Sequence, residues 1–231
     1  LQQIFEDEDY KPDMLKVYPC MVMPGTALQK QYEKGTYTPL TAEEAADIIV
    51  EMKRHVPEWC RIMRIQRDIP TYATTAGVER TNLRQYVMDL AAKRDVHCRC
   101  IRCREVKNTA IDEEPQLIVR TYKAAKGTEH FIAAEAQDKL LGFARLRLLP
   151  RALHPSITDN SAMIRELHVY GTAVAIGEHE GKTQHKGIGR KLMEQAETLA
   201  KEAGKDKLLV ISGVGVRNYY RKLGYEKDGP Y

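Results

Sequence analysis

The chain has 231 residues, enough for one large domain or two modest ones, and its 43% hydrophobic and 29% charged residues are ordinary for a globular protein. No segment approaches the ~18 consecutive apolar residues of a membrane helix, and the acidic start LQQIFEDEDY does not resemble a signal peptide. These features predict a cytoplasmic protein with no membrane contact. Because the sequence begins with Leu and not Met, we expect an N-terminally truncated fragment of a longer protein.

Residues 1–95 alternate between short strands and amphipathic helices. Strands are expected at 15–18 and 60–65. Thr41 and Glu44 form a Thr-x-x-Glu capping box that opens a helix running to Met52, and a second helix is expected at 82–94. This order is typical of βα units. A complete eight-strand barrel takes ~250 residues, so these residues would form only the C-terminal part of one.

A cysteine cluster marks a change of composition at residues 96–115. Five cysteines without a secretory signal indicate a reducing compartment. Three of them, Cys98, Cys100 and Cys103, supply thiolates within six residues, so one further ligand would complete a tetrahedral structural zinc site. The sequence does not choose that ligand among His97, Cys60 and Cys20. An iron–sulfur cluster and three free thiols are the alternatives.

The remaining residues, 116–231, are rich in strands. Strands are expected at 116–122, 129–136, 140–149 and 162–170, with Gln137-Asp138-Lys139 as a hairpin link. A helix, a strand at 208–212, a short helix at 217–223 and a closing strand from Gly224 would follow. The order β-β-β-β-α-β-α-β predicts an α/β fold with a mixed central sheet.

A glycine-rich turn opens the helix at residues 184–204. Gln184, Gly187 and Gly189 give Gln-x-x-Gly-x-Gly, and apolar residues then recur at steps of three or four up to Gly204, which would form an αL cap. A helix that starts this way offers free N–H groups and its positive dipole end to phosphate oxygens. An ordinary glycine turn is the alternative.

The glycine turn, the strand after it and the segment NYYRKLGY (residues 218–225) together resemble the GNAT N-acetyltransferase family. The resemblance covers about residues 116–231. It implies that the glycine turn holds the pyrophosphate of acetyl-CoA, that the preceding strand pairs with the pantetheine arm, and that a tyrosine lies near the thioester sulfur.

Longer segments resemble the family of the Elongator catalytic subunit. These are IRELHVYG, QHKGIGRKLMEQAE and ISGVGVRNYYRKLGY, with HCRCIRC, YPCMVMPGT and RIMRIQRDIP upstream. The resemblance implies the C-terminal part of a radical-SAM βα barrel (1–95), a zinc-binding linker (96–115) and a GNAT domain (116–231). It also implies modification of the wobble uridine of tRNA at C5 towards carboxymethyluridine. The three-cysteine motif for a 4Fe–4S cluster is missing, so the cluster and S-adenosylmethionine are expected only in the full-length parent.

The resemblance places the cofactor on three elements. Backbone groups of residues 166–169 would pair with pantetheine. N–H groups of Ile188, Gly189 and Arg190 would bind pyrophosphate, where a Cβ at Gly187 or Gly189 would obstruct the approach. Cofactor binding is therefore assigned to Glu166, Leu167, His168, Val169, Lys186, Gly187, Ile188, Gly189, Arg190, Tyr219 and Tyr220, with Lys186 and Arg190 neutralising phosphate charge.

The candidate catalytic residues are Tyr220, Glu166 and His168. The Tyr220 phenol would donate to the departing thiolate. Tyr219 and Tyr220 point about 100° apart on a helix, so one is expected to pack and one to face the site. Glu166 is a candidate general base, and His168 is either packed or takes a direct part in the chemistry.

Two basic segments, residues 53–67 and 93–107, predict either RNA contact or a solvated basic face. The resemblance favours tRNA as the partner, with contacts from Arg61, Arg64, Arg67, Arg99, Arg102 and Arg104. A homodimer or a larger Elongator-type assembly is also expected.

Two other functions fit the same fold. One is a protein lysine acetyltransferase that resembles histone-modifying enzymes. The other is a non-catalytic RNA-binding module in which acetyl-CoA is a structural ligand. The cysteine cluster and the basic segments favour an RNA acceptor.

Overall fold

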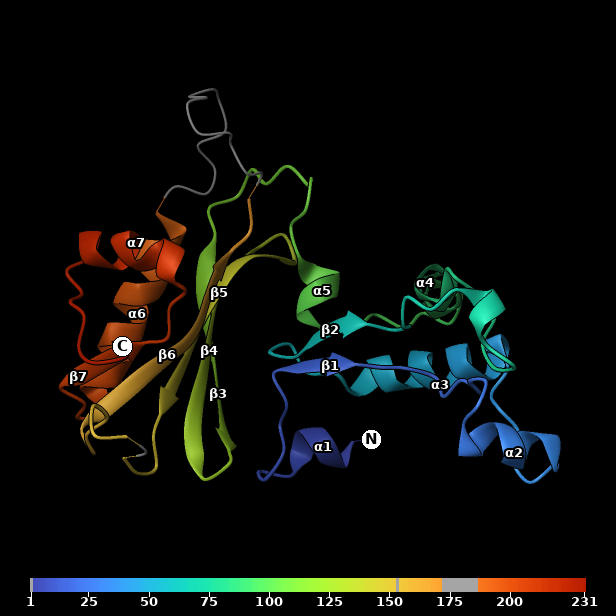
Figure 1. The fold of residues 1–231 in the computed structure, drawn as a ribbon. Coiled ribbons are helices and arrows are strands. Elements are labelled where there is room, and N and C mark those ends of the chain that lie inside the picture. The colour runs from blue at the N-terminus through green and yellow to red at the C-terminus, as the bar shows by residue number, and fades with distance from the viewer. Residues whose placement is uncertain (1, 153, 172–186) are drawn as a thin grey trace. The chain divides into compact units, whose positions relative to one another are not determined.

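The fold is that of a computed structural model in which residues 2–152, 154–171 and 187–231 are described. The chain divides into two compact units (Figure 1). Unit 1 comprises Leu1–Asp7 and Lys11–Cys103, and unit 2 comprises Glu8–Tyr10 and Arg104–Tyr231. No helix in the described ranges is long and apolar enough to cross a membrane.

Unit 1 is a two-stranded parallel sheet packed against helices. Its strands are β1 (Met14–Lys16) and β2 (Arg61–Arg64). The helical elements of unit 1 are α1 (Gln3–Glu6), α2 (Ala27–Glu33), α3 (Ala42–His55), the 3₁₀ turn η1 (Thr71–Ala73), α4 (Leu83–Lys93) and the start of α5 (Ile101–Arg104). One core of buried apolar side chains joins α3, α4 and β2. The parallel pairing of β1 and β2 across α3 confirms the βα rhythm that the sequence predicts.

The capping box of α3 forms as its sequence predicts. Thr41 Oγ1 accepts a hydrogen bond from the Glu44 amide at 3.1 Å, and the Glu44 carboxylate accepts one from the Thr41 amide at 2.8 Å. Basic residues in the last turn of α3 complement the helix dipole. The buried face carries Ile49 and Val50, and both lie in the core of unit 1.

Unit 2 is a five-stranded mixed sheet in the order β3-β4-β5-β6-β7. Its first four strands are antiparallel, and β7 runs parallel to β6. The strands and helices are β3 (Gln116–Ala124), β4 (Gly127–Ala136), β5 (Lys139–Leu148), β6 (Ser161–Val169), α6 (Ile188–Glu202), β7 (Lys207–Val210), η3 (Val214–Val216) and α7 (Arg217–Lys222). This confirms the expected mixed α/β architecture.

Helix α6 packs its apolar stripe on β4, β5 and β6. Ile188, Leu192 and Ala196 are buried against the sheet, and Gly204 follows the helix with φ +72°, as an αL cap requires. Gln137 and Asp138 form the two-residue β4–β5 turn with positive φ values of 50° and 59°. The predicted helix face, cap and hairpin are therefore confirmed.

Two features differ from the expected elements. The closing strand predicted from Gly224 is wrong, because Gly224 adopts φ +94° in a turn and Tyr225 continues without strand pairing. The Tyr225 hydroxyl instead donates to Glu197 of α6 at 2.7 Å. Helix α2 was not expected, although Thr26 caps it through a hydrogen bond from the Gln29 amide.

We expect Thr41→Ala to destabilise unit 1 by about 1 kcal/mol, because the substitution removes an N-cap hydrogen bond. Thr41→Ser keeps the hydroxyl and should remain within a few tenths of a kcal/mol of the parent. Urea unfolding followed by circular dichroism would measure both. An Ala variant as stable as the Ser variant would contradict the capping role.

Candidate functional site

Strand β6 is paired with β7 only over the first half of its length. It pairs with β5 from Ala162 to Val169, but its register with β7 ends at Ile164 and Val210. The last backbone contact between the two is the bond from the Ile211 amide to the Ile164 carbonyl, at 3.0 Å. Among the described strands, residues 166–169 therefore have no pairing partner on the β7 side. An extended ligand with amide groups could pair there as a further strand would.

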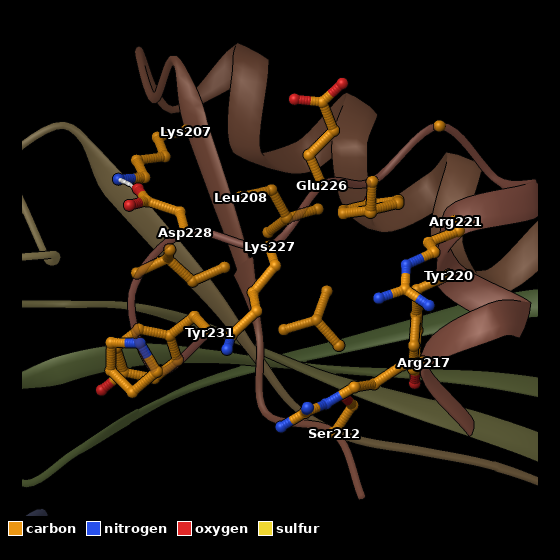
Figure 2. A pocket seen from close by; sticks show the side chains of 15 residues that line it. Lys207, Leu208, Ser212, Arg217, Tyr220, Arg221, Glu226, Lys227, Asp228 and Tyr231 are labelled. Atoms are coloured by element: carbon orange, nitrogen blue, oxygen red, sulfur yellow. Dashed lines mark hydrogen bonds and ion pairs between the residues drawn. The ribbon is translucent and has the colours of Figure 1, made fainter. Parts of the chain in front are cut away.

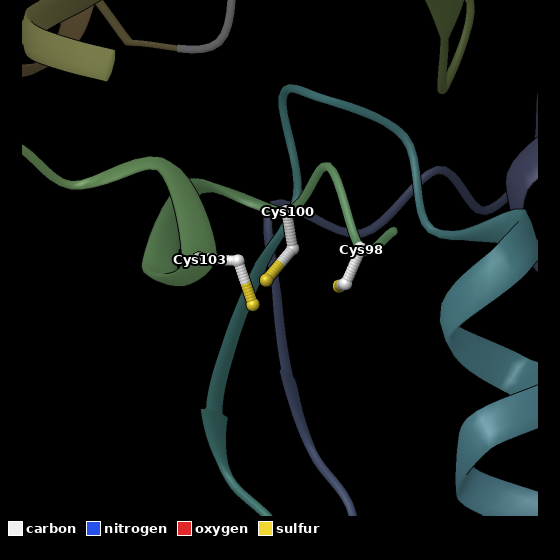
Figure 3. Close-up of side chains that lie close together, drawn as sticks. All are labelled: Cys98, Cys100 and Cys103. Carbon is white, nitrogen blue, oxygen red and sulfur yellow. The ribbon is translucent and has the colours of Figure 1, made fainter. Parts of the chain in front are cut away.

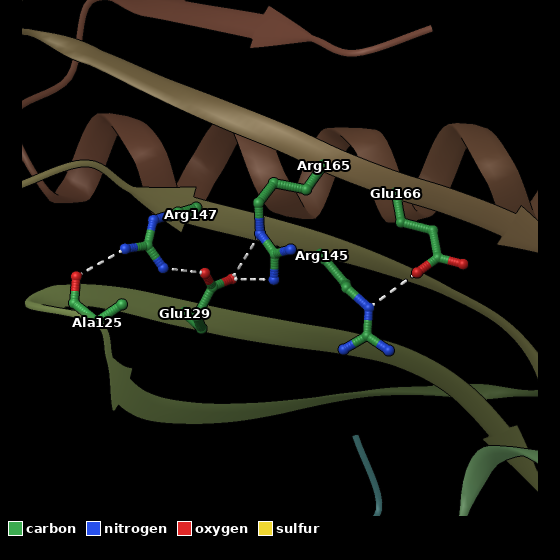
Figure 4. Close-up of polar contacts among 6 residues, drawn as sticks. All are labelled: Ala125, Glu129, Arg145, Arg147, Arg165 and Glu166. Atoms are coloured by element: carbon green, nitrogen blue, oxygen red, sulfur yellow. Dashed lines mark hydrogen bonds and ion pairs between the residues drawn. The ribbon is translucent and has the colours of Figure 1, made fainter. Parts of the chain in front are cut away.

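A β-bulge at Arg165 lies where the two strands separate. Arg145 pairs with Glu166 and Leu146 with Ile164, so Arg165 is the extra residue. Its guanidinium donates to Glu129 from Nε at 3.2 Å and from Nη2 at 3.0 Å (Figure 4). Glu129 is only 2% exposed and also accepts from Arg147 at 2.5 Å. The bulge is thus held by a buried carboxylate between two arginines.

The bulge decides which side chains of β6 face helix α6. Ile164 packs with α6 in the core of unit 2, and strict alternation would put Glu166 and His168 on the same side. The extra residue reverses the order, so Leu167 and Val169 take that side and line a cavity there. Glu166 and His168 lie on the opposite side.

The first turn of α6 lies at the same cavity. Gly187 is the N-cap residue with φ +92°, a conformation that favours glycine, and its position carries no side-chain cap. The amides of Ile188, Gly189 and Arg190 belong to the first helical turn, which has no intrahelical acceptors. These donors and the dipole behind them favour an anion.

The two glycines restrict the site in different ways. A Cβ at Gly189 would lie 2.5 Å from the Tyr219 hydroxyl, whereas one at Gly187 would meet no atom of the described residues within 4 Å. A side chain at Gly189 would therefore require Tyr219 to move, and Gly187 is needed for its backbone conformation. The predicted obstruction of the pyrophosphate by a Cβ at either glycine stays a prediction.

One cavity of about 560 Å³ joins β6, α6 and α7. Its lining combines apolar and aromatic side chains with two basic ones. The lining residues are Leu167, Val169, Gly187, Gly189, Arg190, Val216, Tyr219, Tyr220, Lys222 and Leu223. The structure thus brings together seven of the residues assigned to the cofactor. Lys186 lies outside the described residues. Ile188 is buried, as its apolar position requires.

Both tyrosines of α7 line this cavity. Their rings meet edge to face at 5.2 Å, and burial raises the pKa of each hydroxyl. Tyr220 also packs against the core of unit 2, whereas Tyr219 is 38% exposed. Each hydroxyl is therefore protonated at neutral pH and available as a donor.

A second cavity of about 370 Å³ lies beside β7 and the C-terminal residues (Figure 2). Tyr220 is the member of the predicted site that it shares, and its other polar lining includes Arg217, Arg221 and Lys227. This second cavity contains neither the open part of β6 nor the start of α6. The first cavity contains both and is therefore the better candidate for the cofactor.

Glu166 and His168 have packing partners away from the cavity. Glu166 accepts from Arg145 Nε at 2.9 Å (Figure 4). Arg145 is 1% exposed, and its guanidinium carbon lies 5.2 Å and 5.3 Å from the ring centroids of Phe131 and Phe143. The His168 ring lies 4.5 Å from that of Tyr170 and 5.9 Å from that of Phe143. These contacts favour the packed alternative for His168 and give Glu166 a structural role as the partner of a buried cation.

The three cysteines of the cluster converge (Figure 3). Their Sγ atoms all lie within 4.8 Å of one another, and no other metal-binding group of this kind occurs among the described residues. Hydrogen bonds with Cys103 and Cys98 lower the pKa of Cys100, whereas hydrogen bonds with Cys100 and Cys103 raise the pKa of Cys98. None of the three candidate fourth ligands joins the group. His97 instead pairs with Asp95 at 2.9 Å, and Cys60 lies in the core of unit 1.

A buried lysine that no sequence pattern singles out adjoins the cysteines. Lys53 is 2% exposed, and its Nζ lies 3.8 Å from Cys103 Sγ. Lys53 lies in the basic last turn of α3, and a basic helix end is expected to be exposed to solvent. Only the packing of α3 shows that the Lys53 side chain is buried. Lys222 lies inside the segment NYYRKLGY but received no role from it, and Glu129 belongs to no recognisable motif.

The six arginines assigned to RNA differ in exposure. Arg64, Arg67, Arg99 and Arg102 are exposed, and Arg61 is half-buried. Arg64 pairs with Asp68 at 2.6 Å and Arg99 pairs with Glu58. Arg104 is 3% exposed and donates to Glu135 at 2.7 Å, which Arg120 also contacts. Arg104 therefore serves the interior of unit 2 and not its surface.

The parallel strands β6 and β7 separate, helix α6 starts without a side-chain cap, and a cavity lies between these elements. These features define an α/β fold of the coenzyme-binding class. The model of the acetyltransferase (GNAT) family matches residues 85–225, and that of the Radical_SAM C-terminal domain matches residues 12–92. The chain belongs to the GNAT acetyltransferase family.

Individual relatives match the whole chain. A protein of Methanocaldococcus jannaschii named tRNA uridine(34) acetyltransferase is 44% identical over 100% of this chain and 45% of its own length. Elongator complex protein 3 of Saccharomyces cerevisiae is 41% identical over 100% of this chain and 43% of its own. The solved structure of Methanocaldococcus infernus Elp3 with an N-terminal deletion matches at a TM-score of 0.91 and 42% identity, covering 100% of this chain and 57% of that one. The chain thus spans about half the length of the curated relatives it matches.

We expect Gly189→Glu to abolish acetyl-CoA binding, because it puts a side chain and a negative charge where anion-binding amides begin. Affinity for tRNA should change little. Ala203→Glu adds the same charge at the exposed opposite end of α6 and should leave coenzyme affinity near that of the parent. Calorimetry with acetyl-CoA would measure both, and unchanged affinity in Gly189→Glu would refute the placement of the pyrophosphate.

Proposed function

We propose that this protein is an acetyl-CoA-dependent acyltransferase that acts in modification of the wobble uridine of tRNA. The observation that carries the proposal is the meeting of an unpaired strand edge with an uncapped helix start around one cavity. The names of the relatives support uridine 34 of tRNA as the substrate.

The residues present fit acetyl-CoA. Pantetheine amides would pair with the backbone of residues 166–169, and pyrophosphate oxygens would accept from the amides of Ile188, Gly189 and Arg190. The Arg190 side chain is exposed at the rim, where it would neutralise phosphate charge. Lys186 is assigned the same task.

Tyr220 would act as the general acid when the thioester breaks. In hydrolysis, the oxygen of water bonds to the acetyl carbonyl carbon, the carbon–sulfur bond breaks, and the departing thiolate takes a proton from the Tyr220 hydroxyl. The proton that the attacking water releases then restores the Tyr220 phenol, so acetic acid and free thiol are the products. Because burial raises the pKa of Tyr220, the phenol holds its proton at neutral pH. We propose that tRNA stimulates this step.

The tRNA contacts would come from the exposed arginines of unit 1, namely Arg64, Arg67, Arg99 and Arg102, with Arg61 beside them. Their charges fit a phosphate backbone. Carboxymethyl chemistry at C5 would require a 4Fe–4S cluster and S-adenosylmethionine, which we assign to the full-length parent and to no residue of this chain. A homodimer or an Elongator-type assembly is part of the same proposal, as is the division at residues 95 and 115.

The cysteine cluster would hold a structural zinc ion. Three sulfur atoms within 4.8 Å of one another fit three corners of a tetrahedral site. Lys53 would offset the excess negative charge of three thiolates around a divalent ion. Bound metal would join α5 to the segment before it and so stabilise the end of unit 1.

We expect tRNA to stimulate acetyl-CoA hydrolysis, and Tyr220→Phe to lower the stimulated turnover ~100-fold or more, as loss of a general acid does. Tyr72→Phe, at a side chain that is 90% exposed, is the matched control and should leave turnover unchanged. Release of free thiol gives the rate. Stimulation by tRNA would also exclude a purely structural role for the coenzyme. Acetyl-lysine formed on a protein at a comparable rate would favour the lysine acetyltransferase instead.

We expect about one zinc per chain by elemental analysis, and Cys100→Ser should lose most of it together with thermal stability. Cys20→Ser, at an exposed cysteine outside the cluster, should retain the metal. Stoichiometric iron in place of zinc would favour the iron–sulfur alternative, and full metal content in Cys100→Ser would contradict the site.

A further inference from the structure

The cavity beside β7 is not explained by the proposed acetyl-CoA site. Its volume is about 370 Å³, which falls within the range of about 300–1,000 Å³ for small-molecule pockets. It is formed by β7, α7 and the segment that follows Gly224 (Figure 2). Among the described residues, Tyr220 alone lines both this cavity and the first one. A ligand bound here would therefore occupy a space of its own beside the coenzyme.

The charges around this cavity are not balanced. Four of its lining residues are basic and two are acidic, so the lining carries a net charge of +2. Asp228 forms an ion pair with Lys207, which leaves Asp228 unavailable to the other cations. The Glu226 carboxylate points away from Arg217 and Lys227 in the close-up (Figure 2). The excess positive charge therefore lies on the basic side chains other than Lys207.

These remaining basic side chains are Arg217, Arg221 and Lys227, and their charged ends lie around the cavity (Figure 2). Arg217 and Lys227 make no ion pair or side-chain hydrogen bond with any described residue, and the Arg221 guanidinium donates to the neutral Asn218 amide oxygen at 2.8 Å. Ser212 adds a hydroxyl to the same lining. Guanidinium and ammonium groups both bind phosphate oxygens, so this arrangement is complementary to an anion with several acceptor oxygens.

The rest of the cavity is largely apolar and aromatic. Leu208 and Val210 of β7 line it, together with the rings of Tyr220 and Tyr225, whose centroids are 6.2 Å apart. The cavity is much larger than a single phosphate group. A ligand that filled it would therefore combine an anionic group with an apolar or aromatic part.

We propose that this cavity binds a phosphate monoester on a small apolar or aromatic body, the class to which mononucleotides belong. The phosphate would accept from Arg217, Arg221 and Lys227, and the body would lie against Leu208 and Tyr220. A monoester carries about two negative charges near neutral pH, whereas a diester carries one, so the net charge of +2 favours the monoester. The inference goes beyond the proposed function and does not depend on it.

Two sources offer such a group, a free mononucleotide and the terminal phosphate of an RNA strand. Calorimetry with the full chain distinguishes them, with uridine 5′-monophosphate as one probe and 5′-phosphorylated tetrauridylate as the other. We expect binding of one molecule per chain, and binding at least about tenfold weaker for uridine and for unphosphorylated tetrauridylate, which lack the monoester. The phosphorylated probe that binds more tightly identifies the source.

Arg217→Met and Lys227→Met each remove one charge from the cavity. Each should lower the affinity for the phosphorylated probe about tenfold or more, as loss of a hydrogen bond between charged groups does. Lys201→Met is the matched control, because Lys201 is exposed near the end of α6 and lines neither cavity. Lys227 is exposed, so Lys227→Met serves as the test if circular dichroism shows that Arg217→Met does not fold.

Failure of both phosphorylated probes to bind, or equal affinity in the parent, Arg217→Met and Lys227→Met, would overturn the proposal. Gly189→Glu should leave this binding unchanged, because Gly189 does not line the cavity. Loss of probe binding in Gly189→Glu but not in Arg217→Met would place the phosphate at the start of α6 and would also overturn it. Acetyl-CoA binding is measured on the same samples, and its absence with normal probe binding would count against the proposed function alone.

Discussion

The candidate coenzyme site depends on the contact between Glu129 and Arg165. A carboxylate that is 2% exposed is costly to bury unless cations surround it, and removing a partner from such a group typically costs about 3–5 kcal/mol. Glu129 therefore fixes Arg165, and Arg165 is the extra residue of the bulge. The bulge in turn ends the alternation that would otherwise bring Glu166 to the cavity side. The shape of the candidate cavity thus depends on a polar cluster on the other face of the sheet.

The separation of β6 from β7 has a second consequence. Once the register ends at Ile164, backbone groups at residues 166–169 have no partner on that side among the strands that the structure describes. Such a condition is unfavourable unless solvent or a ligand satisfies these groups. The start of α6 is unsatisfied for the same reason, since its first amides have no intrahelical acceptors and Gly187 supplies no cap. Two sets of unpaired donors and acceptors thus face one cavity, and a long ligand with amides at one end and phosphates at the other complements both.

The sequence predicts the parts of this site that depend on local chemistry. Gly187, the apolar stripe of α6, the Gly204 cap and the Gln137-Asp138 turn are set by conformational preferences within a few residues, and the structure has all of them. The bulge is different, because it exists only in the register between β5 and β6, and Glu129 is 36 residues from Arg165 in the chain. Strict alternation of side chains along β6 would therefore place Glu166 and His168 on the cavity side of the strand, where the structure has Leu167 and Val169.

The same limit explains the contrast between Arg104 and its basic neighbours. Charge density predicts a solvent-facing or RNA-facing surface for the whole segment, and this describes Arg99 and Arg102. Arg104, however, begins unit 2, and there it meets Glu135, whose carboxylate also holds Arg120. A buried carboxylate between two arginines thus occurs twice in unit 2, at Glu129 and at Glu135. In each cluster one arginine comes from a hairpin neighbour of β4, Arg147 on β5 or Arg120 on β3, and the other, Arg165 on β6 or Arg104 on α5, comes from farther away in the chain. Each cluster thus ties β4 to an element that local pattern alone does not place beside it.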